Sequence, residues 1–132
     1  MDRKATLSTA WIFVLLNVIF RDLHELFRPG MLAEMTTGTV NGVQVTEQTL
    51  LLAGVLLEIP IAMVILSRVL SRPVNRWANI VGAVLAIPLL LSAVPSDLDD
   101  IFFAGVEVVT LVLIIWYAWR WPDAGTRPTG PK

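Results

Sequence analysis

Four long apolar stretches, separated by short polar segments, dominate the hydrophobic pattern of the chain. They predict helices over about 6–28, 47–71, 74–94 and 98–121. Each has the length, about 20 residues, that an α-helix needs to cross the hydrocarbon core of a bilayer. The pattern therefore predicts an all-α integral membrane protein. Residues 1–121 would form a four-helix transmembrane domain, and 122–132 a disordered cytoplasmic tail.

Composition supports a membrane setting. The chain is 55% apolar and only 16% charged, whereas soluble domains carry about 25% charged residues. Short connections after the second and third helices favour an antiparallel bundle. Pro60 and Pro88 lie inside predicted helices, where a proline removes one backbone hydrogen bond and favours a kink.

The connections between the helices carry turn and capping signals. The segment 36–46 alternates around Asn41-Gly42, a pair that suits a two-residue β-turn, so we expect a short hairpin outside the membrane. Thr46 is the expected N-cap of the second helix. Ser96 followed by Asp99 resembles a capping box at the start of the fourth.

One side of the third helix carries small and amide side chains. Such residues allow a neighbouring helix to approach closely in a membrane. We therefore expect this side to face another helix; its members are Asn75, Asn79, Gly82, Ala83, Ala86 and Ala93.

Basic residues alternate between the two sides of the predicted bundle. Three segments are rich in them: the start of the chain, the connection 67–76 and the segment after the fourth helix. The other two connections are acidic or nearly balanced. Because basic loops stay in the cytoplasm, we predict that both termini are cytoplasmic and that the hairpin 36–46 is external.

Three ionisable residues, one from each of three predicted helices, fall near the middle of the membrane: Arg21, Glu58 and Glu107. An isolated charge at the centre of a membrane helix costs about 2.5–3.5 kcal/mol. Laid across the bilayer, the three lie at similar depth. We therefore expect Arg21 to face Glu58, Glu107 or both, since a guanidinium can bridge two carboxylates.

Further polar residues are expected around this group. Asn17 and Asn79 would donate hydrogen bonds to the same network, and His24 and Glu25 would lie further out, toward an external mouth. Two acids and one arginine leave one excess negative charge. Either one acid is protonated, or a cation or ligand amine shares the site.

These charges leave three classes of function open. The first is a pocket, open to the outside, that binds or transports a small solute, proton or cation. The second is a structural or accessory subunit in which the charges only hold helices together. The third is a membrane enzyme that acts on a lipid or quinone-like substrate, with Glu58 or Glu107 as proton donor.

The sequence offers little to other chemistries. There is no cysteine and only one histidine, and no nucleophile elbow, P-loop or dinucleotide fingerprint. We therefore expect no catalytic residue, metal or cofactor. A net charge of −1 gives no reason to expect nucleic acid. The expected partners are the lipid bilayer, a small solute or cation, and a second copy or partner subunit.

Three segments together resemble a known family. They are the run Trp11–Gly30, the turn Gly38-Thr39-Val40-Asn41-Gly42, and Leu57-Glu58-Ile59-Pro60-Ile61-Ala62-Met63. The chain is similar in these segments to small bacterial four-helix membrane proteins catalogued only as a domain of unknown function. The resemblance implies a bacterial inner-membrane setting, and it carries no activity or catalytic residue.

Overall fold

The computed structural model describes residues 2–40, 42–92 and 97–122. Its elements in chain order are α1 (Arg3–Leu26), α2 (Met31–Met35), β1 (Thr39–Val40), β2 (Val43–Gln44), α3 (Glu47–Val69), α4 (Arg72–Leu91) and α5 (Leu98–Trp119). Four helices of the described part, α1, α3, α4 and α5, are long and apolar enough to cross a membrane. The expected helical fold class is confirmed. Beyond Pro122, the predicted disordered tail lies outside the described residues.

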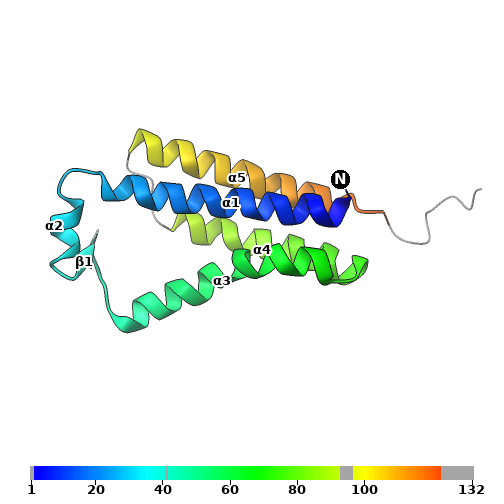
Figure 1. Ribbon diagram of the computed structural model, residues 1–132, viewed down its shortest axis with the longest axis horizontal. Helices are drawn as coiled ribbons and strands as arrows, with labels where there is room; N and C mark the ends of the chain where they lie inside the picture. The colour runs from blue at the N-terminus through cyan, green and yellow to red at the C-terminus, as the bar shows by residue number, and fades with distance from the viewer. Residues whose placement is uncertain (1, 41, 93–96, 123–132) are drawn as a thin grey trace, which may run out of the picture.

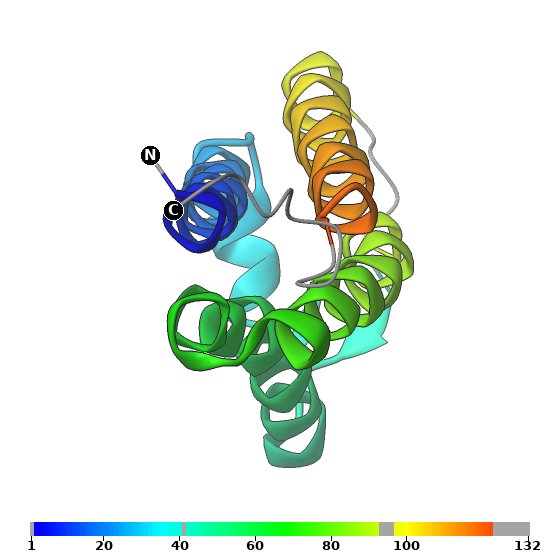
Figure 2. The same ribbon diagram turned by 90° about the vertical axis from the view of Figure 1, so that its right-hand side faces the viewer.

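The four long helices pack side by side (Figure 1). Helix α1 packs against α3 and α5, and α4 packs against the same two helices, which gives the ring seen end-on in Figure 2. Arg3 at the start of α1 donates a hydrogen bond to the carbonyl oxygen of Tyr117 near the end of α5. Arg21 near the end of α1 bonds Asp100 at the start of α5.

Trp11 of α1 is the centre of the core and is fully buried. The predicted small-residue side of α4 faces inward, because Asn75, Asn79, Gly82, Ala83 and Ala86 are all buried; Ala93 lies outside the described residues. At Gly82 an added Cβ would lie 3.3 Å from Met63 Cγ and 3.6 Å from Trp11 Cζ2. The absence of a side chain there lets α4 approach α1 and α3 closely.

A hydrogen-bonded cluster joins three helices around the indole of Trp11. Trp11 Nε1 donates to Asn79 Oδ1 at 2.8 Å, and Ser67 Oγ donates to the same oxygen at 3.2 Å. The amide of Asn79 donates to Asn75 Oδ1 at 2.6 Å. Because buried polar groups without partners are destabilising, this cluster fixes how α1, α3 and α4 align along their axes.

The first half of α3 leaves the other helices (Figure 1). Residues 47–55 are exposed on every side, and the first buried residue of α3 is Pro60. A proline inside a helix clashes with the preceding turn and bends it, so the divergence begins where the sequence predicts a kink. In a membrane, lipid would cover this apolar half-helix.

The predicted hairpin is confirmed. Val40 pairs with Val43 in an antiparallel ladder, and Gly42 has a φ of 79°, which glycine adopts without steric cost; Asn41 lies outside the described residues. Thr46 caps α3 as predicted, reciprocally with the Thr49 side chain. The short helix α2 was not predicted. The N-cap of α5 is Asp97 rather than the predicted Ser96, which lies outside the described residues.

Substitutions at two glycines test the close packing of α4 against α1 and α3. We expect Gly82→Leu to destabilise the protein by about 1–3 kcal/mol, because the added side chain overfills the contact with Met63 and Trp11. The control is Gly54→Leu in the diverging half of α3, where a Cβ would meet no atom within 4 Å. Thermal unfolding in detergent measures both. Equal losses in the two variants would contradict the packing described here.

Candidate functional site

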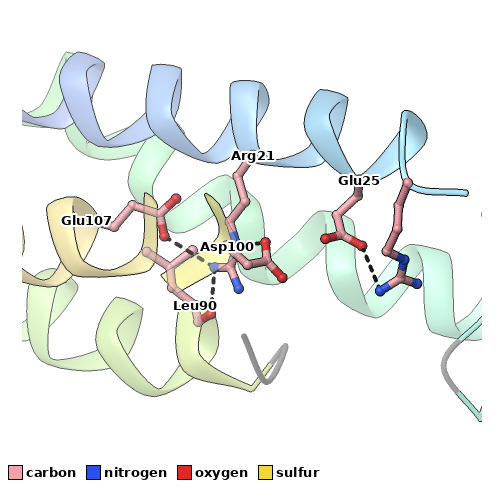
Figure 3. A network of polar contacts seen from close by, with 6 residues as sticks. Arg21, Glu25, Leu90, Asp100 and Glu107 are labelled. Atoms are coloured by element: carbon pink, nitrogen blue, oxygen red, sulfur yellow. Dashed lines mark hydrogen bonds and ion pairs between the residues drawn. The ribbon is translucent and has the colours of Figure 1, made fainter. Parts of the chain in front are cut away.

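Arg21 lies at the centre of a buried group of charges between α1 and α5 (Figure 3). Its Nε donates to Asp100 Oδ1 at 3.0 Å, and its Nη1 lies 3.4 Å from Glu107 Oε2. The same Nη1 donates to the carbonyl oxygen of Leu90 on α4 at 3.3 Å. The side chain therefore joins three helices. We call Arg21, Asp100 and Glu107 the charge triad.

The triad is almost sealed from solvent. Arg21 is 6% exposed, Asp100 is 5% exposed and Glu107 is fully buried. The expected pairing of Arg21 with Glu107 is confirmed. The triad holds two carboxylates against one guanidinium, so it carries one excess negative charge when both acids are ionised.

Glu107 is only half satisfied. Its Oε2 faces Arg21, but its Oε1 is buried and has no hydrogen-bond partner among the residues that the structure describes. A buried carboxylate oxygen without a donor is strongly disfavoured. A proton on this oxygen would neutralise the buried charge, and a bound cation would give the oxygen a partner, so Glu107 Oε1 is the candidate binding atom.

Charged groups continue from the triad toward one end of the bundle. One turn beyond Arg21 on α1, Glu25 is half-buried and pairs with Arg28 at 3.5 Å, and Figure 3 places Glu25 on the same side of α1 as Arg21. Beside them is an open pocket of about 370 Å³, lined by His24, Phe27, Arg28, Pro29, Asp97 and Asp99. Of the two residues expected at an external mouth, His24 lines this pocket and Glu25 does not.

Glu58 does not join the triad, so its expected pairing with Arg21 is wrong. It is exposed in the diverging half of α3, on the side of the helix that faces away from the buried residues Pro60 and Met63. Leu51 and Ile65, seven residues to either side on the same face, are 68% and 65% exposed. The sequence correctly predicts that Glu58 lies at the middle of its helix. It could not show that the kinked α3 turns this acid away from α1.

The remaining predicted residues have other contacts. Asn79 belongs to the Trp11 cluster, so its expected place beside Arg21 is wrong. Asn17 is half-buried and donates to the carbonyl of Phe13 in its own helix at 2.8 Å, so it too is outside the triad. His24 is exposed, lines the pocket and packs edge-on against Phe103, with ring centroids 5.2 Å apart.

Asp100 is the site residue that sequence reasoning missed. It lies in the first turn of α5, next to a connection that is acidic in the sequence, so the pattern does not single it out as an intramembrane charge. A signal was present: Asp100 precedes Glu107 by seven residues, which places both acids on one face of a helix. No cluster of three or more metal-ligating side chains occurs in the described part of the chain.

A pair of double-mutant cycles tests the triad against the sequence-based pairing. We expect Arg21→Met and Asp100→Leu to show a coupling energy of about 0.5–3 kcal/mol, because the two groups are in contact. Arg21→Met combined with Glu58→Gln should be additive within about 0.5 kcal/mol. Chemical unfolding in detergent gives both values. Strong coupling to Glu58 together with additivity at Asp100 would contradict the observed geometry.

Comparison with known proteins gives a family but no described activity. The family described as "Family of unknown function (DUF6326)" matches residues 1–126. No curated protein and no solved structure matches significantly. The resemblance drawn from the sequence is confirmed, because the match covers nearly the whole chain: this protein belongs to the DUF6326 family.

Proposed function

We propose that this protein is a multi-pass membrane protein that binds a proton or a small cation at Glu107, from the external side of a bacterial inner membrane. The observation that carries the proposal is the buried Glu107 Oε1, which has no donor among the described residues. Ionisable groups inside membrane spans most often mark ion or substrate sites. The excess negative charge of the triad supports a positively charged occupant.

The proposed orientation is an antiparallel bundle with both termini and the α3–α4 connection in the cytoplasm. Its support is the distribution of basic residues. Arg3, Arg72, Arg76 and Arg120 all lie at the same end of the helices, where Arg72 donates to the carbonyl of Pro122 and Arg76 to that of Trp119. The pocket beside His24 is then external.

The proposed route runs from that pocket to Glu107 along the facing sides of α1 and α5. Glu25 and Arg28 lie beside the pocket, and Arg21 with Asp100 lies between Glu25 and Glu107. A cation entering from outside would meet Glu25 and then Asp100 before it reached Glu107. Arg21 holds the two acids of the triad apart and keeps the site from carrying two uncompensated charges.

A purely structural role is the alternative that one observation favours. The 3.0 Å bond between Arg21 and Asp100, with the added bond to Leu90, joins α1, α4 and α5 as an accessory subunit would need. That role accounts for Arg21 and Asp100. It leaves the second acid, Glu107, without a purpose, because a neutral side chain there would leave a balanced ion pair.

Orientation can be tested by cysteine labelling, since the natural chain has no cysteine. Gln44→Cys in β2 should react with a membrane-impermeant maleimide in intact cells. Ser71→Cys, which is also exposed but lies between α3 and α4, should react only after the cells are opened. Labelling of Ser71→Cys alone in intact cells would reverse the proposed topology.

The binding site can be tested with Glu107→Gln. Wild-type protein in detergent should change its thermal stability with pH and with a panel of alkali cations, because occupancy of Glu107 removes the penalty on Oε1. Glu107→Gln should remain folded and lose that response, since an amide still hydrogen-bonds but carries no charge.

Glu58→Gln is the matched control, because Glu58 is a second intramembrane acid that lies outside the triad. It should respond as the wild type does. A shift with pH alone assigns a proton, and a shift with one cation at fixed pH assigns that cation. Flat responses from all three proteins would refute binding and leave the structural role.

A further inference from the structure

We propose that the groove between the first half of α1 and the last half of α5 binds one acyl chain of an anionic phospholipid, with its phosphate held by Arg3 and Arg120. The groove has a volume of about 260 Å³ and is formed by residues of these two helices alone. It lies at the opposite end of the bundle from the charged pocket. The inference rests on the proposed membrane setting and orientation but not on binding at Glu107.

The groove offers an apolar surface although two threonines line it. Thr110 Oγ1 donates to the carbonyl of Val106 at 2.8 Å, and Thr6 Oγ1 donates to the carbonyl of Asp2 at 3.0 Å. Both hydroxyls are therefore used within their own helices. Ala10 on α1 is small enough to leave the groove open against Ile114 on α5.

The groove has the dimensions of part of a lipid tail. Its lining on α5 runs from Thr110 to Tyr117, which at 1.5 Å per residue is about 10 Å along the axis. This direction follows the helices and therefore the membrane normal. A lipid tail lies along the same direction in a bilayer, so it can enter the groove without bending.

Two guanidinium groups lie against the aromatic residues that end the groove. The Arg3 guanidinium is 4.1 Å from the ring centroid of Tyr117, and that of Arg120 is 5.0 Å from the ring of Trp116. Trp116 and Tyr117 both line the groove. Stacking on the aromatic rings holds both guanidinium groups at the end of the groove. The phosphate of a lipid whose tail fills the groove would lie at the same end.

Charge, rather than the apolar groove, selects the occupant. A tail gains little on leaving bulk lipid for an apolar groove, because both surroundings are hydrocarbon. Basic side chains near the cytoplasmic surface do attract anionic lipids. Asp2, the carboxylate at the N-cap of α1, accepts a hydrogen bond from the backbone of Ala5, and Arg3 donates to the carbonyl oxygen of Tyr117 beside the groove.

The test measures which lipid stays bound to the purified protein in a neutral detergent, by native mass spectrometry with added phosphatidylglycerol or phosphatidylcholine. Wild type should retain phosphatidylglycerol preferentially. Arg3→Gln and Arg120→Gln should each weaken that preference by about fivefold. Ala10→Phe, which fills the groove, should abolish retention of both lipids.

Two matched variants on α3 serve as controls. Arg68→Gln removes an exposed arginine at the same end of the bundle, and Ala62→Phe adds the same ring away from the groove. Both should retain phosphatidylglycerol as wild type does. For each variant, a melting temperature without lipid equal to that of wild type shows that the variant is folded. If Arg3→Gln does not fold, the result for Arg120→Gln tests the role of charge.

Four results would overturn the proposal. Equal retention of the two lipids by wild type would leave only ordinary boundary lipid. A loss with Arg68→Gln as large as with Arg3→Gln would point to general surface charge. Full competition by glycerol phosphate would indicate a soluble anion site without an acyl chain. Retention unaffected by Ala10→Phe would remove the lipid tail from the groove.

Discussion

The penalty for burying a charge away from water is the constraint on which this structure depends. Arg21 is buried near the end of α1, where a lone guanidinium would be strongly disfavoured, and α4 and α5 supply three acceptors around it. Breaking such a buried pair by removing one partner typically costs about 3–5 kcal/mol. The register of α1 against α5 is therefore fixed at Arg21, just as the register of α1 against α3 and α4 is fixed at Trp11.

These two polar centres divide the bundle into a packed half and an open half. Around Trp11, the amides and hydroxyl of α3 and α4 satisfy one another, and Gly82 allows close contact. Around Arg21, the bending of α3 removes one helix from the ring, and α1, α4 and α5 alone surround the triad. This asymmetry explains why the charged residues and the 370 Å³ pocket lie together at one end, while the core residues lie toward the other.

The two proposed sites lie at opposite ends of the bundle and differ in charge. At the end with the charged pocket, acids outnumber bases near the triad, which suits a cation. At the opposite end, arginines stack on Tyr117, Trp77, Trp119 and Trp116, which suits contact with anionic headgroups. The same distribution of charge underlies the proposed orientation, so a reversed topology would weaken both proposals.

The sequence by itself determined the four long helices, the hairpin, the cap at Thr46 and the small-residue side of α4, because each follows from local periodicity or turn chemistry. It also indicated that Arg21 needs an acidic partner, with Glu58 and Glu107 as the candidates. Only the tertiary structure decided which other acids and amides take part. Glu58 lies outside and Asp100 inside because the bend of α3 at Pro60 and the relative axial positions of α1 and α5 depend on packing between helices. A proline in the pattern predicts a bend but not its direction, and a pattern read along one helix carries no information about its axial position relative to another helix.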